Sequence, residues 1–313
     1  MRTIHPFDAL PLPRRAILPT LGALALLSGA AYAADKVPVT ASFSILADLV
    51  RVVGGDRVSV KSLVGPDEDA HVFEPRPSDV KTIVGSKLVV TNGLGFEPWA
   101  AKLIKSAAFK GEVLVAATGV KPLKMKGAKR DAGHSHGEND PHAWQNPNHV
   151  MIYVRNIATA LSKVDPAGSS IYQANAESYV KELQQLDGWS KEQISFIPRP
   201  KRKVITSHDA FGYFAMQYDI TFLAPQGAST STEPSARQVA QLIQQIQREK
   251  IRAVFVENMS NPKLIAQLSK DAGVTVGPSL HADALSAADK PASTYLSMMR
   301  HNVTLLVAGM KLN

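Results

Sequence analysis

The sequence predicts an α/β protein made of two open, mostly parallel sheets that are joined by one long rigid helix. Two observations lead to this prediction. Short runs rich in Val, Ile and Leu alternate with helical patterns in both halves of the chain, which is typical of parallel sheets covered by helices. Between the halves, residues 169–197 form one nearly unbroken helical pattern. At about 1.5 Å per residue, such a helix is roughly 43 Å long.

The first 33 residues have the features of a cleaved export signal. Arg14 and Arg15 precede an apolar stretch at 16–30, and residues 31–33 (AYA) offer a small-x-small cleavage pattern. The apolar run is shorter than the roughly 20 residues that a membrane-spanning helix needs. We therefore interpret residues 1–33 as a signal peptide that is removed. Two alternatives remain open: a retained anchor, and a twin-arginine signal built on the arginine pair.

The amino-acid composition limits where the protein is expected to be located and which partners it is expected to bind. The chain has no cysteine, so it has no disulfide, no thiolate ligand and no acceptor for an N-terminal lipid. We expect a monomer that is free in the periplasm of a Gram-negative cell and is not lipid-anchored. The net charge of +8 is spread along the sequence. Its two denser clusters, at 121–130 and 201–203, lack interleaved aromatic residues, so nucleic acid is not an expected partner.

The N-terminal lobe is predicted to span residues 34–167. Its third strand ends at the turn-forming pair Asn92-Gly93, and Asn148 is the expected cap of its last helix. Residues 121–141 are polar and without periodicity, so they are interpreted as a loop that contains His134 and His136. The expected strands are 38–44, 58–64, 87–93 and 112–118, and the expected helices are 45–55, 98–108 and 148–164.

The linking helix is predicted at 168–197, and Pro198 and Pro200 end it because proline cannot continue a helix. The C-terminal lobe then spans 198–313. Its expected strands are 203–208, 220–225, 251–258 and 274–280, and its expected helices are 211–218, 235–250, 262–273 and 294–311.

Four residues spaced about seventy apart suggest a metal site: His71, His142, His208 and Asp283. Each follows a hydrophobic run or stands at the mouth of a helix, and in α/β proteins such strand ends line a crevice. Three imidazoles and one carboxylate make a closed four-coordinate set that suits Zn²⁺. Because two of the residues belong to each predicted lobe, we place the site in the cleft between the lobes.

Other interpretations of these polar residues stay open. A single histidine is more often an ordinary surface or core residue than a ligand, and Asp283 alone could cap a helix. His281, two residues before Asp283, could compete as a ligand. Glu257 could orient a ligand or replace Asp283. His149 and His301 are interpreted as structural or surface residues.

Several longer segments carry a family resemblance. They are DAHVFEPRPSDV, NGLGFEPWA, DPHAWQNPNHV, TSHDAFGYFA, STEPSARQVAQLIQQIQ and VFVENMSNPKLIAQLSKDAGV. In this order they resemble the periplasmic substrate-binding proteins of zinc and manganese ABC transporters, also called metal-receptor adhesins. The resemblance covers essentially the whole chain after the signal. It implies a two-lobed fold with a metal buried between the lobes, bound by His71, His142, His208 and Asp283.

The third ligand position indicates the zinc branch. The manganese branch of the family has a glutamate where this chain has His208. Three nitrogens and one carboxylate favour Zn²⁺ over Mn²⁺, which prefers oxygen ligands. Many zinc members also have a long His- and Asp-rich loop, whereas the loop here is short. His134 and His136 are therefore either an accessory metal site or part of a solvated loop.

The expected function is high-affinity zinc binding in the periplasm, with delivery of Zn²⁺ to a membrane permease driven by a separate ATPase subunit. A periplasmic metal chaperone is a further candidate partner. The chain has no Gly-x-x-x-x-Gly-Lys loop and no His-Glu-x-x-His motif, so we expect no enzyme activity. The alternatives are a manganese or iron receptor on the same fold, and a zinc-dependent hydrolase with Glu257 as its base.

Overall fold

Two parallel sheets organise the chain in the computed structural model, which describes residues 35–125 and 139–313. The first sheet has the strand order β2-β1-β3-β4, and all three of its pairings are parallel. Val39 of the central strand β1 lies opposite Val60 on one side and Leu88 on the other. The strands are β1 (Val37–Phe43), β2 (Val58–Val64), β3 (Leu88–Thr91) and β4 (Glu112–Val115).

Helices follow the strands of this sheet, and three of them were predicted, whereas α2 was not among the expected helices. They are α1 (Ser44–Gly54), α2 (Pro77–Val84), α3 (Ala100–Ser106) and α4 (Pro147–Val164). The cap of α4 is Asn146 rather than the predicted Asn148, and its side chain accepts a hydrogen bond from the Asn148 N–H at 2.9 Å. Pro147 then takes the first helical position, where a missing N–H costs nothing.

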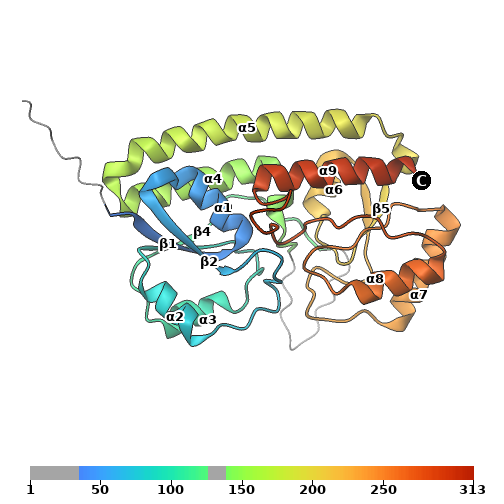
Figure 1. The fold of residues 1–313 in the computed structure, drawn as a ribbon, viewed down its shortest axis with the longest axis horizontal. Coiled ribbons are helices and arrows are strands. Elements are labelled where there is room, and N and C mark those ends of the chain that lie inside the picture. Colours follow the sequence, from blue (N-terminus) through green and yellow to red (C-terminus); the bar gives the residue numbers. More distant parts are fainter. Residues whose placement is uncertain (1–34, 126–138) are drawn as a thin grey trace, which may run out of the picture. The chain divides into compact units, whose positions relative to one another are not determined.

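The long helix α5 (Ser169–Ser195) lies within the predicted range 168–197. It runs beside α4 and α9 along one side of the fold (Figure 1). After it come β5 (Lys203–Ile205) and β6 (Thr221–Leu223), which pair in parallel. The remaining helices are α6 (Gly212–Tyr218), α7 (Ala236–Glu249), α8 (Pro262–Ala272) and α9 (Tyr295–Lys311). Among the described residues, no helix is long and apolar enough to cross a membrane.

The predicted strands 251–258 and 274–280 are not regular strands. Their backbones make only isolated parallel bridges, Ile205 with Val254 and Glu257 with Leu280. Pro278 gives a physical reason for the second segment, since proline has no N–H to donate to a ladder. The α/β class with parallel sheets is confirmed, although the second sheet has shorter strands than the pattern predicted.

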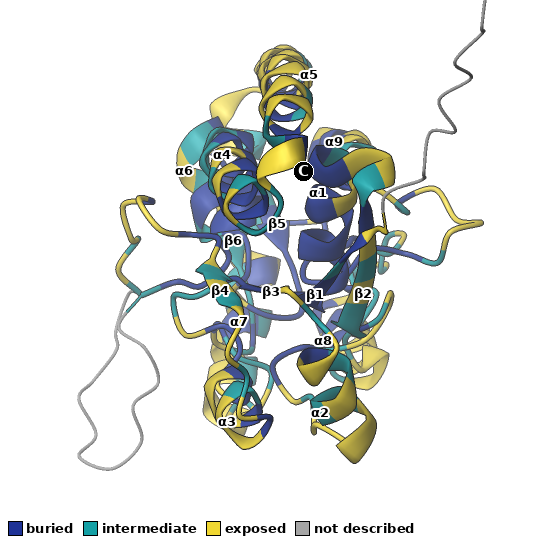
Figure 2. Cartoon of the chain, turned by 90° about the vertical axis from the view of Figure 1, so that its left-hand side faces the viewer, coloured by how far each residue is buried: buried dark blue, intermediate teal, exposed yellow. Residues whose placement is uncertain are grey.

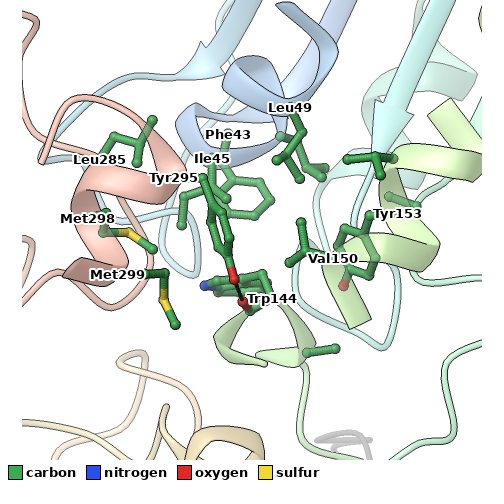
Figure 3. Close-up of a cluster of buried hydrophobic side chains, with 14 of the residues drawn as sticks. Phe43, Ile45, Leu49, Trp144, Val150, Tyr153, Leu285, Tyr295, Met298 and Met299 are labelled. Atoms are coloured by element: carbon green, nitrogen blue, oxygen red, sulfur yellow. Dashed lines mark hydrogen bonds between the residues drawn. The ribbon is translucent and has the colours of Figure 1, made fainter. Parts of the chain in front are cut away.

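Among the described residues, the larger hydrophobic cluster extends across both predicted lobes, and a smaller one lies between α7, α8 and the segment around Val254. Figure 2 shows α1 as almost entirely buried beside the strands of the first sheet. In Figure 3, Phe43 and Ile45 lie around Trp144 together with Tyr295 of α9. The Tyr295 backbone N–H also donates to Asp48 of α1 at 2.7 Å. Residues 35–313 form one compact unit, and the division at 34–167, 168–197 and 198–313 stays a prediction.

Candidate metal centre

His71 lies in the loop that follows β2, and two hydrogen bonds hold its backbone. Its own N–H donates to the Asp69 Oδ1 atom at 2.9 Å. The Trp99 indole N–H donates to the carbonyl of Ala70 at 2.8 Å. The ring of His71 packs edge-on against Phe96, with centroids 4.8 Å apart. The loop therefore presents the imidazole toward the interior without any regular secondary structure.

His142 is positioned by a hydrogen-bond chain that starts at the end of β3. The Asn92 side chain donates to the carbonyl of Pro141 at 2.9 Å and accepts from the Tyr153 hydroxyl at 2.6 Å. The Asp140 Oδ1 atom accepts both the backbone N–H and the ring Nδ1–H of His142, at 2.9 and 2.8 Å. With Nδ1 as the donor, the lone pair of His142 is on Nε2.

His208 follows β5 and is held in the same way by Glu257. One carboxylate oxygen of Glu257 accepts the backbone N–H groups of Ser207 and His208, at 2.9 and 3.1 Å. The other oxygen is hydrogen-bonded to the ring Nδ1 of His208. Glu257 is 1% exposed and His208 is fully buried. The arrangement again leaves Nε2 of the imidazole as the free lone pair.

Asp283 is tied to the segment that carries His142. The carbonyl of its neighbour Ala282 accepts the Trp144 indole N–H at 2.9 Å and the Gln145 amide at 2.7 Å. The Trp144 carbonyl in turn accepts the hydroxyl of Tyr295 at 2.8 Å, and these two residues face each other in Figure 3. These hydrogen bonds hold together three segments that are far apart in sequence, around residues 144, 282 and 295, next to the carboxylate of Asp283.

All four predicted residues converge. One ligand atom from each of His71, His142, His208 and Asp283 lies within 4.8 Å of the others. The Asp283 Oδ2 atom is 3.2 Å from Nε2 of His71 and 3.1 Å from Nε2 of His208. The Asp283 Oδ1 atom is 3.6 Å from Nε2 of His142, and the Nε2 atoms of His71 and His142 are 3.3 Å apart.

The centre contains buried polar atoms without hydrogen-bond partners. Among the described residues, both carboxylate oxygens of Asp283 and the Nε2 atom of His208 are buried and make no hydrogen bond. Burying such atoms unpaired is costly, and native proteins rarely tolerate it. A cation among the four side chains would satisfy all three atoms at once. The donor set therefore fits a metal ion.

The charges of the centre follow from burial and mutual attraction. Burial lowers the pKa of the His71 imidazole below its usual value. Burial opposes the charged form of His208 as well, but Glu257 and Asp283 raise its pKa well above the usual value. Despite complete burial, His208 and His142 hold the pKa of Asp283 well below that of an ordinary aspartate. Asp283 is therefore an anion available to a metal.

Asp140 is the residue of the centre that sequence reasoning missed. The only signal is its place two residues before His142, with proline between them. Of the roles considered for Glu257, the structure supports the orientation of a ligand, since Glu257 is hydrogen-bonded to the ring nitrogen of His208 that faces away from the centre.

The remaining histidines lie elsewhere. His281 and His301 pack against each other with ring centroids 5.3 Å apart, and His149 packs against Tyr213. None of them belongs to the group of four. His134 and His136 lie outside the described residues, as does the predicted signal peptide.

The family model described as "Zinc-uptake complex component A periplasmic" matches residues 39–309. The chain belongs to this family. It is 32% identical over 283 residues to the manganese-binding lipoprotein MntA of Halalkalibacterium halodurans, covering 90% of this chain and 91% of that protein. It is 33% identical over 309 residues to the iron-binding protein YfeA of Yersinia pestis, covering 96% and 97%.

A solved structure agrees with this membership. The periplasmic zinc binding protein TroA from Treponema pallidum superposes with a TM-score of 0.82 at 26% identity, covering 88% of this chain and 99% of that one. Proteins of this family are metal-binding receptors of ABC importers and not enzymes. This confirms two expectations from the sequence, namely that the chain is a metal-binding receptor and that it is not an enzyme. The relatives are named for manganese, iron and zinc, so membership leaves the identity of the metal open.

Proposed function

We propose that this chain is a high-affinity zinc receptor of the periplasm, which binds one Zn²⁺ through His71, His142, His208 and Asp283. The observation that carries the proposal is the spacing of the ligand atoms. In a tetrahedron with bonds of about 2.0–2.1 Å, neighbouring ligand atoms are about 3.3–3.4 Å apart. Four separations lie near that value: 3.1, 3.2 and 3.6 Å from one or the other oxygen of Asp283 to the three imidazoles, and 3.3 Å between His71 and His142. All four ligand atoms lie within 4.8 Å of one another.

The chemistry of the donors supports zinc over manganese. Three of the four ligand atoms are imidazole nitrogens, and Zn²⁺ binds such sets more strongly than Mn²⁺ does. The carboxylates of Asp140 and Glu257, each on the second ring nitrogen of a ligand, add to the basicity of the imidazoles. A manganese or iron receptor is the second candidate, because relatives 32–33% identical are named for those metals.

The receptor would deliver its metal to a membrane permease that is driven by an ATPase subunit, with a periplasmic chaperone as a further candidate partner. A chain without cysteine has no thiol for a lipid anchor, in contrast to the lipoprotein named among its relatives. We therefore propose a free monomeric protein in the periplasm. His134 and His136 are proposed as an accessory metal site that assists capture.

Metal competition tests the proposal. The metal-free protein is titrated with Zn²⁺ and with Mn²⁺, and its melting temperature is measured with each. We expect one Zn²⁺ per chain, and a stabilisation of about 4 kcal/mol at zinc concentrations near 1,000 times the dissociation constant. The His208→Glu variant should lose zinc affinity and gain relative affinity for Mn²⁺, because an oxygen replaces a nitrogen. Equal stabilisation of the wild-type protein by both metals would rule out the zinc assignment.

A further inference from the structure

A cavity of about 610 Å³ lies beside His71, and His71 is the one proposed ligand on its wall. Phe96 and Pro141 form part of the wall, together with residues of the segment 225–234. The other three proposed ligands are 0% exposed, whereas His71 is 9% exposed. Of the four ligands, His71 is therefore the one that lies between the metal position and this cavity.

Of the three imidazoles, the ring of His71 is also the least firmly held. His142 and His208 each have a carboxylate hydrogen-bonded to ring Nδ1. Within residues 35–125 and 139–313, the Nδ1 atom of His71 has no such carboxylate. The residue is held by the packing of its ring against Phe96 and by the hydrogen bond from its backbone N–H to Asp69. For a metal ion to be released through the cavity, the side chain of His71 has to rotate away from the ion. How readily the side chain rotates depends on how firmly its loop is held.

The carboxylate of Asp69 joins the loop of His71 to the segment 225–234, which forms part of the cavity wall. Its Oδ1 atom accepts the His71 N–H, and its Oδ2 atom accepts the hydroxyl of Thr230 at 2.7 Å. Thr230 belongs to the segment 225–234, whose start is joined to the backbone beside His208 by the bridge between His208 and Gln226. The bond between Asp69 and Thr230 thus connects the loop of His71 to the part of the chain that carries His208.

We propose that Asp69 and Thr230 are a pair of positioning residues that keep His71 against the bound metal and slow its release through this cavity. The inference rests on the proposed four-residue site. Among the described residues, the side-chain hydrogen bond of Thr230 goes to Asp69 and not to a proposed ligand, so it acts through Asp69 and the loop. Both residues are partly buried, where a hydrogen bond to a carboxylate is stronger than in open water.

The release rate tests the proposal. The full chain is loaded with one Zn²⁺, mixed with excess chelator, and the loss of metal is followed over time. Thr230→Val keeps the shape of the side chain and removes the hydroxyl. It should release Zn²⁺ about three- to tenfold faster than the wild-type protein, the range expected for one partly exposed hydrogen bond to a charged acceptor. Thr230→Ser keeps the hydroxyl and should release at the wild-type rate.

Thr232→Val is the matched control. Thr232 lies on the same cavity wall, is exposed, and makes no side-chain hydrogen bond within the described residues. Its substitution should leave the release rate unchanged. Loss of one partly buried hydrogen bond should lower the melting temperature of metal-free Thr230→Val by only a few degrees, so the variant stays folded and its release rate reports the positioning of His71.

A double-mutant cycle decides whether the two residues act together. In an Asp69→Ala background, Thr230→Val should have no further effect on release, because its partner is already gone. An undiminished effect in that background, a wild-type rate for Thr230→Val, or equal acceleration by Thr232→Val would each overturn the inference. If the wild-type chain took up no Zn²⁺, the proposed function itself would fail, which is a different result from tight binding with an unaltered release rate.

Discussion

Glu257 holds His208 by both its backbone and its ring. One carboxylate oxygen accepts the His208 N–H at 3.1 Å, and the other is hydrogen-bonded to ring Nδ1. The contact fixes the tautomer of the imidazole, because an Nδ1–H donor leaves the lone pair on Nε2. Once its proton is displaced, this Nε2 atom is free for a metal, and the nearest oxygen of Asp283 is 3.1 Å from it.

Glu257→Gln should weaken metal binding although residue 257 is not a proposed ligand. The glutamine amide can turn its NH₂ group toward Nδ1 and so move the ring proton to Nε2, where it blocks ligation. The loss of such an outer contact typically costs about 10- to 100-fold in metal affinity. Competition titration against a chelator of known affinity measures the change. Glu192→Gln, an exposed site on α5, should bind as the wild-type protein does, and an equally weak Glu192→Gln would contradict the assigned contact.

Metal affinity should rise with pH above 6.5. Burial disfavours the charged form of His208, yet Glu257 and Asp283 raise its pKa above the usual value. In the metal-free protein, the stability that this proton adds is present below the unfolded pKa of about 6.5 and is lost as the pH rises through the raised folded pKa. A metal must displace the same proton, so the logarithm of the affinity should increase with pH, with a slope approaching about one.

Glu257→Gln serves as the comparison for this slope. Without the glutamate charge, the pKa of His208 falls and the slope above pH 7 should become shallower. Isothermal titrations at pH 6.5, 7.5 and 8.5, in two buffers with different ionisation enthalpies, report both the affinity and the protons released. Parallel slopes for the two proteins would mean that Glu257 does not control the proton on His208.

Asn92→Ala should reduce both stability and metal affinity. The substitution leaves the buried Tyr153 hydroxyl and the Pro141 carbonyl without the partners they have at 2.6 and 2.9 Å. Unsatisfied buried groups cost about 1–3 kcal/mol each, and freedom of the Pro141 backbone should let His142 move. Chemical denaturation of the metal-free protein and zinc titration check the two effects. A stable variant with unchanged zinc affinity would show that the chain from β3 does not position His142.

Deleting residues 127–137 should leave equilibrium zinc affinity within about threefold of the wild-type value, because one four-ligand site accounts for tight binding. The flanking residues Lys124 and Asn139 are bridged in antiparallel fashion, so a short turn can close the gap. Asp140 is kept, because it bonds Nδ1 of His142. A large loss of equilibrium affinity would move His134 and His136 from an accessory role into the main site.

Much of the fold was predictable from local pattern. The strands around Val39 and Val60 and the helix that starts at Ser44 are where apolar periodicity placed them, because their apolar residues recur with the strand or helix period and Gly54 and Gly55 end the helix. The pattern failed at 251–258 and 274–280, which are apolar but pair only at isolated bridges. Hydrophobicity measures burial, whereas a strand also needs an uninterrupted run of backbone partners.

The sequence by itself determined which residue types were available for a metal: three histidines and one aspartate spaced about seventy residues apart, and no cysteine. Only the tertiary structure decided that they meet, that Asp140 and Glu257 hold two of the rings, and that Asp69 connects the loop of His71 to Thr230. The physical reason is the range of the interactions. Periodicity reports contacts between residues that are a few positions apart. The bond of Asp140 to His142 is of this local kind, whereas the other bonds join segments separated by tens of residues or more. The geometry of those bonds exists only after the sheets and helices have packed.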